Sequence, residues 1–319
     1  MKVIKRSTIA GLSDDEADLC YSLGIGHMVM LLAGYLVKYC GWTFERVQHG
    51  LEVFAGVKSL TMEMIYAGLT FKTFEIHDCP YQDFLSPAGF LGVFGQIAKC
   101  YVGGLLHWAT VCSSWVYLNL GTSHRVCYNP LGTNAGSVRD GNIMVSRMCF
   151  LILFSVVRKV HWLLEQPLSS KMQEHPKMRL LQRLRDETVL DGHEAHGWMG
   201  AYGARTPKAS KWEGSPAWVS KLENSLTKSQ LACLGDDQVV VRDATKGSVT
   251  GGKHLKETQA YPHGYGQVVA NLFGIAFSKH EVPPCRLDRL SEISRKALLE
   301  TDWSDMELGG LFSKLEKEL

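Results

Sequence analysis

The chain has 319 residues, of which 45% are hydrophobic and 21% are charged, and its formal net charge at pH 7 is +2. This composition is typical of a soluble globular protein with one large domain or two smaller ones. Because the net charge is close to zero, a nucleic-acid partner would have to bind a local basic face rather than be attracted by the whole chain. Composition alone does not favour DNA or RNA.

Nine cysteines, an odd number, are scattered through the chain, and no two of them form a Cys-x-x-Cys pair. This pattern predicts reduced thiols in an intracellular protein, nuclear or cytoplasmic, rather than a disulfide framework or a zinc site. The longest apolar stretch, Met148 to Val157, is shorter than the roughly 20 residues that cross a bilayer. The N-terminal residues lack an apolar secretory core. We therefore expect neither secretion nor membrane insertion.

In chain order, the elements begin with a helical N-terminal segment over residues 1–48, where Ser13 and Glu16 form a capping box. From residue 51, apolar runs of strand length alternate with helical stretches. The predicted strands span residues 51–55, 71–76, 105–110, 160–165 and 194–199. Of the helical stretches between them, the first ends at residue 68 and the others span residues 86–101, 142–157 and 169–185. Since parallel strands need crossovers of about a dozen residues or more, this alternation predicts a doubly wound, Rossmann-like α/β sheet of parallel strands.

The rest of the chain loses this alternation. Residues 201–258 are rich in Gly, Lys, Ser and Trp, and we interpret them as a small, less regular target-recognition region. Their tryptophans, with Trp198, would stack nucleic-acid bases or else form a small core. A turn and helix at 261–273 rejoin the sheet, so residues 49–200 and 259–279 form the predicted catalytic domain. The charged, partly helical residues 280–319 are predicted to be a peripheral tail.

A possible cofactor site follows the first predicted strand. That strand runs into a turn at Gly56, where backbone N–H groups and a helix N-terminus can approach a nucleotide-like ligand. Glu75 ends the next strand about 20 residues later, where a carboxylate can accept the ribose hydroxyls of a nucleoside. An ordinary βα turn remains the alternative. His77, Asp78 and Cys79 are too close together in sequence to form a standard metal site alone, and we expect no metal.

A possible nucleophile and an acid follow the later strands. Cys112 comes after the strand at 105–110, and Glu165 ends the strand at 160–165. Neighbouring parallel strands present their carboxyl-end residues to one crevice, so the thiol and the carboxylate can reach the same substrate. This pair indicates covalent catalysis on an electrophilic ring. The alternative is a buried cysteine and a glutamate that caps the following helix.

The order of these residues resembles the motif series of the DNA cytosine-5 methyltransferases. Leu51-Glu-Val-Phe-Ala-Gly56 is close to that family's Asp/Glu-Leu-Phe-Ala-Gly, Val111-Cys112-Ser113 stands where it has Pro-Cys-Gln, and Glu165-Gln166-Pro167 stands where it has Glu-Asn-Val. Tyr202-Gly-Ala-Arg-Thr-Pro-Lys208 is similar to Tyr-Gly-Val-Pro-Gln-x-Arg-x-Arg. The resemblance covers residues 49–208 with a return at 261–273, about half of the chain. The neighbours of Cys112 and the two residues after Glu165 depart from the family pattern.

The resemblance implies S-adenosylmethionine as cofactor and cytosine in nucleic acid as substrate, with DNA favoured over RNA. The cofactor-binding residues that it implies are Phe54, Ala55, Gly56, Glu75 and Asp83. The implied catalytic residues are Cys112, Glu165 and Arg205, and Ser113 and Lys208 are predicted to bind the substrate. Asn119 and Arg125 belong to the long polar loop after Cys112, which we expect to close over a flipped-out base and so to bind the substrate too. The departures leave a second hypothesis open, a catalytically inactive protein that keeps the fold and binds cofactor or nucleic acid. A third is an α/β enzyme of other chemistry. The oligomeric state stays open.

Overall fold

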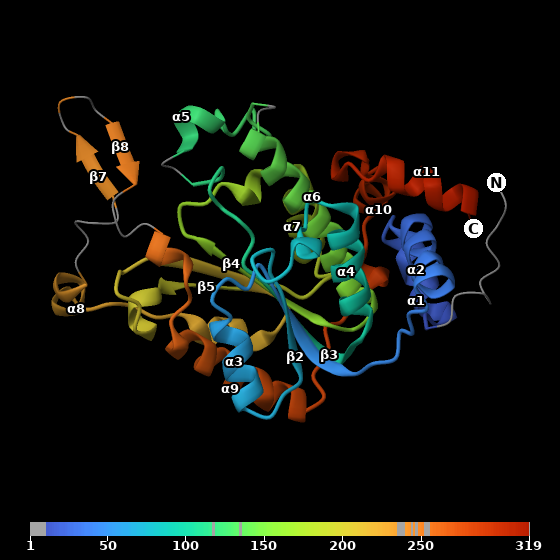
Figure 1. The fold of residues 1–319 in the computed structure, drawn as a ribbon, viewed down its shortest axis with the longest axis horizontal. Helices are drawn as coiled ribbons and strands as arrows, with labels where there is room; N and C mark the ends of the chain where they lie inside the picture. Colours follow the sequence, from blue (N-terminus) through green and yellow to red (C-terminus); the bar gives the residue numbers. More distant parts are fainter. Residues whose placement is uncertain are drawn as a thin grey trace.

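The computed structural model describes residues 11–116, 119–133, 136–234, 240–243, 245, 248–251 and 256–318. Its centre is a six-stranded sheet in the order β2-β1-β3-β4-β6-β5 (Figure 1). The strands are β1 (Gln48–Val53), β2 (Phe71–Phe74), β3 (Cys100–Trp108), β4 (His161–Pro167), β5 (His193–Trp198) and β6 (Ala209–Gly214). A separate hairpin consists of β7 (Val240–Asp243) and β8 (Ser248–Gly251). The predicted α/β class is confirmed.

The sheet is mixed rather than wholly parallel. β2, β1, β3 and β4 are parallel neighbours, as the alternation predicts, whereas β6 lies antiparallel between β4 and β5. The connection from β5 to β6 spans residues 199–208, which is shorter than the crossover of about a dozen residues that a parallel pair needs. The prediction of an all-parallel sheet is therefore wrong at β6. The expected boundary at residue 200 also cuts through the sheet, because β6 belongs to it.

Helices cover both faces of this sheet (Figure 1). On one face α3 (Ser59–Tyr66) and α9 (His263–Ser278) pack side by side, next to the 3-10 turn η6 (Ala217–Leu222). The other face carries α4 (Pro87–Ala98), α6 (Gly136–Val157) and α7 (Pro176–Asp186). Successive strand residues alternate between the two cores, since Leu163 lies in the first and Leu164 in the second. The remaining helices are α1 (Asp14–Ser22), α2 (Gly26–Cys40), α5 (Leu120–Ser123), α8 (Lys228–Cys233), α10 (Glu292–Leu299) and α11 (Gly309–Glu318).

Helix α6 runs through the larger of the two cores, which lies between the sheet and helices α4, α6 and α7. Its residues from Val145 to Val157 are all buried. Within the described ranges it is the one helix long and apolar enough to cross a membrane, and 83% of its most apolar window is buried inside the protein. The core helix of a soluble protein passes the same test, so this length and composition are weak evidence for a membrane span.

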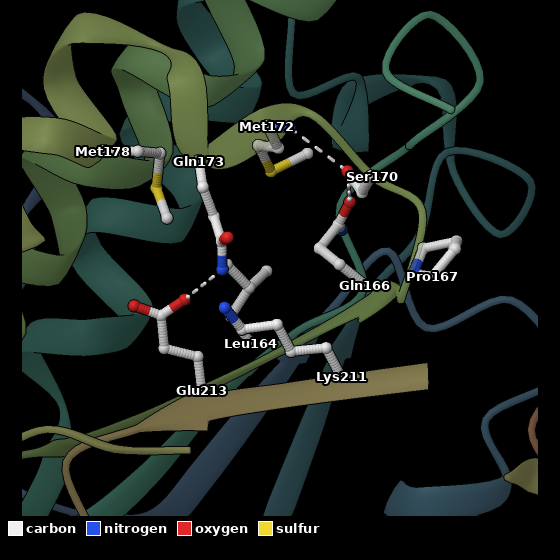
Figure 2. Close-up of a pocket in the computed structure, with 9 residues that line it drawn as sticks. All are labelled: Leu164, Gln166, Pro167, Ser170, Met172, Gln173, Met178, Lys211 and Glu213. Atoms are coloured by element: carbon white, nitrogen blue, oxygen red, sulfur yellow. Dashed lines mark hydrogen bonds between the residues drawn. The ribbon is translucent and has the colours of Figure 1, made fainter. Parts of the chain in front are cut away.

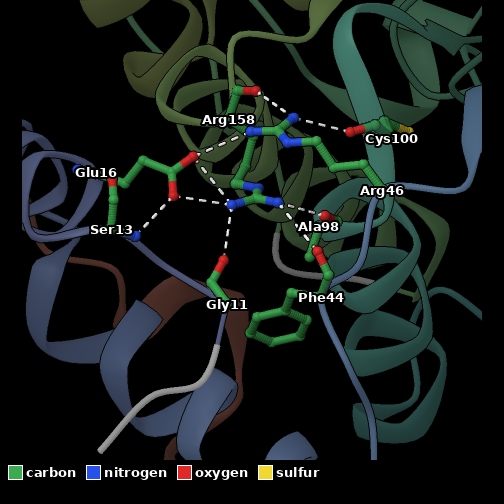
Figure 3. Close-up of polar contacts among 8 residues, drawn as sticks. All are labelled: Gly11, Ser13, Glu16, Phe44, Arg46, Ala98, Cys100 and Arg158. Carbon is green, nitrogen blue, oxygen red and sulfur yellow. Dashed lines mark hydrogen bonds and ion pairs between the residues drawn. The ribbon is translucent and has the colours of Figure 1, made fainter. Parts of the chain in front are cut away.

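The N-terminal helices are fastened to the sheet domain by buried charges (Figure 3). The predicted capping box is confirmed, because the Ser13 and Glu16 side chains each accept the other's backbone N–H. The Glu16 carboxylate also forms ion pairs with Arg158 at 2.9 Å and with Arg46 at 3.1 Å. The Arg158 side chain is only 3% exposed. It donates in addition to the carbonyl oxygens of Gly11, Phe44 and Ala98.

The C-terminal residues are not a peripheral tail. Leu298, Trp303 and Met306 are buried in the larger core with α4 and α6. The buried Arg147 guanidinium of α6 donates to the carbonyl of Met306 at 2.9 Å and to that of Phe84 at 2.6 Å. The apolar residues of α10 and of the turn after it therefore complete the core, although most of their neighbours in sequence are polar and exposed.

Candidate functional site

The turn between β1 and α3 has the backbone of a ligand cradle. Phe54, Gly56 and Lys58 all have positive φ angles, of 63°, 51° and 61°. A Cβ added to Gly56 would meet no atom within 4 Å, so the space above the turn is open. Ala55 is buried beneath it. The Gly56 N–H is bonded to Glu75 and the Lys58 N–H to the carbonyl of Ala55, so what the turn offers a ligand is a surface free of side chains at Gly56, which fits the close approach of a nucleotide-like ligand.

Glu75 follows β2 directly and faces this turn. Its carboxylate accepts the N–H of Gly56 at 2.9 Å and that of His77 at 3.2 Å, and its own N–H donates to Gln82. Asp83 lies a little further on, where its carboxylate accepts the Leu85 N–H at 2.9 Å, just before α4. The carboxyl ends of β1 and β2 therefore bring the predicted turn and the predicted acid together, with fixed backbone donors between them. This arrangement fits a nucleoside whose hydroxyls bind a carboxylate.

The Phe54 ring points the other way, into the protein. It packs edge-on against Phe84 at 5.2 Å between ring centroids and lies 6.4 Å from Trp108. Phe54 is partly buried and therefore anchors the turn to the core.

Cys112 lies in the loop that follows β3, beside the end of β4. The side-chain amide of Gln166 donates to the carbonyl of Thr110 at 2.9 Å, which clamps the start of this loop to β4. The carbonyl of Cys112 accepts the N–H groups of Trp115 and Val116, so the residues after it turn tightly. Parallel pairing of β3 with β4 therefore places the thiol and Glu165 at the same edge, as predicted.

Glu165 is the most completely held side chain of the site. Ser210 Oγ donates to its Oε1 at 2.6 Å, and the phenol of Tyr261 donates to its Oε2 at 2.9 Å. The ammonium of Lys208 lies 3.4 Å from Oε1, and the Glu165 side chain is 5% exposed. A buried carboxylate needs such partners, because an unpaired charge in this position would be strongly destabilising.

Burial and the charge of Glu165 oppose thiolate formation at Cys112. Burial, and after it the Glu165 carboxylate, raise the pKa of the Cys112 thiol to about 11, while Lys208 lowers it. Reactive cysteines are normally found with a lowered pKa. In this structure the thiol is protonated at neutral pH, so an attack by sulfur would need its proton to be removed as substrate binds.

The other residues predicted to act on the substrate differ in their exposure and in their contacts. Arg205 is exposed, and within the described residues it has no hydrogen bond or ion pair, so its guanidinium is available to a ligand. Ser113 is exposed too, and its carbonyl accepts the side-chain amide of Asn119. Lys208 contacts Glu165 rather than open solvent.

Arg125 is the clear exception among the predicted substrate-binding residues. It is 2% exposed and stacks on Trp115, with the guanidinium carbon 3.3 Å from the ring centroid. All five of its N–H groups have acceptors, which are the backbone and side chain of Ser114, the carbonyls of Pro130 and Val138, and the Asn142 side chain. Arg125 therefore holds the loop together and has no donor left for a substrate. The alternation pattern could not show this, because the acceptors lie in the loop itself and in the extra first turns of α6.

Tryptophans of the expected recognition region also lie inside the protein. Trp212, on β6, is fully buried, and Trp218 is 5% exposed, both in the core under α9. Of the two interpretations of these tryptophans, the small core is confirmed for Trp212 and Trp218.

Sequence reasoning missed several polar groups buried on the strands that form the site. Ser210 was hidden in the segment interpreted as irregular. Glu52 lies on β1, where burial raises its pKa to about 7 although Thr61 donates to it twice. His107 is fully buried on β3, which lowers its pKa to about 3, and its ring bonds to Tyr265. A signal was present, since charged or polar residues at the centre of apolar strands are unusual.

A small cavity lies on the opposite face of β4 (Figure 2). Gln166 and Pro167 line it from the strand, and Lys211 and Glu213 line it from β6. Its volume is about 10 Å³, room for about one water molecule. It is too small for a cofactor or a base.

The fold and these side chains define an α/β protein with a polar site at the carboxyl ends of β1 to β4. No three His, Cys, Asp or Glu side chains are grouped to hold a metal ion within the part of the chain that the structure describes. A scan against protein-family models gives no match, and a search of curated proteins gives none either.

Proposed function

We propose that the protein is an S-adenosylmethionine-dependent methyltransferase that acts on carbon 5 of cytosine in nucleic acid, with DNA ahead of RNA. The observation that carries the proposal is the order of groups along one sheet edge. The open Gly56 turn and Glu75 end β1 and β2, while Cys112 and Glu165 end β3 and β4. The choice of cytosine rests on the resemblance of the motif series.

In the proposed reaction the proton of Cys112 Sγ passes to the Glu165 carboxylate as sulfur forms a bond to carbon 6 of the ring. The protonated Glu165 donates to the ring nitrogen, which takes up the negative charge that this attack creates, and carbon 5 becomes nucleophilic. S-adenosylmethionine, when bound at the Gly56 turn, supplies the methyl group. Water then takes the carbon 5 proton, and cleavage of the S–C bond returns its electron pair to sulfur. The ring nitrogen gives its proton back through Glu165 to sulfur, which releases the methylated base and the thiol. Arg205 has a free guanidinium with which to orient the base.

Transfer of labelled methyl groups from S-adenosylmethionine to DNA and to RNA tests the reaction. Cys112→Ser should abolish transfer, whereas Cys127→Ser, at an exposed cysteine outside the site, should leave it unchanged. Unchanged transfer by Cys112→Ser would remove Cys112 from the mechanism. A covalent adduct with DNA that carries 5-fluorocytosine would support it, because fluorine replaces the proton that must leave carbon 5.

Calorimetric binding of S-adenosylmethionine tests the cofactor turn separately. Gly56→Val would fill the open space above the turn, so we expect at least about a tenfold loss of affinity. Gly41→Val is the matched control, because Gly41 also has a positive φ, of 63°, and open space around its Cβ position, but ends α2. Equal affinities in the two variants would contradict a cofactor at Gly56.

The raised pKa of Cys112 favours a second candidate, a protein that binds cofactor or nucleic acid without turnover. A thiol with a pKa of about 11 is poorly prepared for attack at neutral pH. Cofactor binding without methyl transfer to any nucleic acid would support this candidate, and any turnover that depends on Cys112 would exclude it.

A further inference from the structure

Tyr261 connects the two halves of the proposed site. It lies just before α9, 96 residues after Glu165 in the chain, and is 7% exposed. Its phenol donates to Glu165 Oε2 at 2.9 Å, and its own carbonyl accepts the hydroxyl of Ser59 at 2.7 Å. Ser59 is the first residue of α3 and follows the Gly56 turn directly. One residue therefore contacts both the carboxylate and the helix that begins at the cofactor turn.

The surroundings of Tyr261 fix the direction of its hydrogen bond. Burial and the charge of Glu165 raise its pKa well above the usual value of a tyrosine, so the phenol stays protonated and donates. Lys208 lies 5.3 Å from the ring centroid, and the His107 ring packs edge-on at 5.5 Å. The other titratable groups that act on the phenol are Tyr265 on α9 and Glu52 on β1.

We propose that Tyr261 is a positioning residue, which holds the Glu165 carboxylate in place and ties that carboxylate to the turn proposed to bind the cofactor. The inference rests on the proposed function for the roles of Glu165 and Gly56. Ser210 and Lys208 both contact Oε1, so Tyr261 is the group that fixes Oε2. Without it the carboxylate can rotate about its remaining contacts.

Tyr261→Phe removes the bond to Glu165 but keeps the ring and the carbonyl that Ser59 contacts. Tyr265→Phe is the matched control, because it removes a buried phenol from the same core that bonds to His107 and not to Glu165. In a methyl-transfer assay we expect Tyr261→Phe to lower kcat about tenfold or more, with little change in the KM for S-adenosylmethionine, as expected when the lost contact orients a reacting group. Tyr265→Phe should stay within about threefold of the unchanged protein.

Alkylation of Cys112 by iodoacetamide at pH 9, followed by peptide mass spectrometry, gives a readout that does not depend on turnover. The Glu165 carboxylate raises the pKa of the Cys112 thiol, and loss of the phenol donor leaves more of its negative charge to act on that thiol. We expect Tyr261→Phe to slow alkylation severalfold, since each pKa unit changes the thiolate fraction about tenfold. Tyr265→Phe should not slow it.

The outcomes separate the two proposals. Equal alkylation rates in Tyr261→Phe and Tyr265→Phe, or unchanged kcat in Tyr261→Phe, would overturn the positioning role. If alkylation slows only in Tyr261→Phe while no protein, including the unchanged one, transfers methyl groups, the proposed function fails and the positioning of Glu165 stands.

Discussion

Replacement of Lys208 by Met tests whether this lysine compensates the buried Glu165 carboxylate. The two charges are 3.4 Å apart, a distance at which unit charges attract by about 5 kcal/mol at an effective dielectric constant of about 20 and by about 1 kcal/mol in bulk water. The exposed fractions are 16% for Lys208 and 5% for Glu165, and Glu165 keeps the bonds from Ser210 and Tyr261. We therefore expect Lys208→Met to lower the free energy of unfolding by about 3 kcal/mol.

Lys211→Met is the control for this measurement. The Lys211 side chain is 15% exposed and pairs with Glu194 at 2.8 Å, but Glu194 is 37% exposed and can return to water. Loss of this ion pair should lower the free energy of unfolding by about 1 kcal/mol or less. Urea unfolding followed by tryptophan fluorescence measures both variants. A loss in Lys211→Met as large as that in Lys208→Met would refute the reasoning, and so would faster alkylation of Cys112 in Lys208→Met, because Lys208 lowers the pKa of that thiol.

Three further predictions concern the fold. Burial raises the pKa of Glu52 to about 7, so between pH 4.5 and 7 the native protein keeps a proton that the unfolded chain releases. The free energy of unfolding should therefore fall by about 3 kcal/mol over this range. Urea unfolding of Glu52→Gln should lack this contribution, and an equal dependence on pH in both proteins would contradict it. Arg158→Met should lower the free energy of unfolding by about 3–5 kcal/mol. It should also expose α1 to proteases, because Arg158 holds this helix through Glu16. Lys296→Met is the control, since the Lys296 side chain is 73% exposed, and it should change the free energy of unfolding by less than about 0.5 kcal/mol. Trp303→Ala should cost about 3–5 kcal/mol in urea unfolding, and a negligible loss would show that the C-terminal residues are dispensable for the core.

Most of the sheet could be predicted because apolar runs of strand length alternate with helical stretches. β1 to β5 and the helices between them lie close to their predicted positions. β6 was missed because Ala209–Gly214 contains the charged residues Lys211 and Glu213. Both face the larger core, on the side of the sheet that carries α7. There Glu213 forms a buried ion pair with Arg185. A single sequence does not reveal that two charges neutralise each other across 28 residues.

The candidate site was predictable only in part for a related reason. Gly56, Glu75, Cys112 and Glu165 each follow or end a strand, and strand ends can be located from the apolar pattern. The partners of Glu165 come from a loop and a strand far along the chain, so nothing near Glu165 in sequence identifies them. Arg125 was wrongly predicted to bind substrate. A polar loop can supply hydrogen-bond acceptors for its own side-chain N–H groups, and these groups are then not available to a ligand.

The antiparallel insertion of β6 has a consequence for any attempt to express part of this chain. β5 pairs with β6 and not with β4, so a fragment that stops at residue 200 would hold β5 without a partner. It would also leave β4, with its apolar residues from Trp162 to Leu164, as an unpaired edge strand of the sheet. Such borders recruit strands from other molecules. A shortened protein made to isolate the cofactor-binding half would therefore be expected to self-associate, and an inactive fragment would carry no information about the chemistry of Cys112.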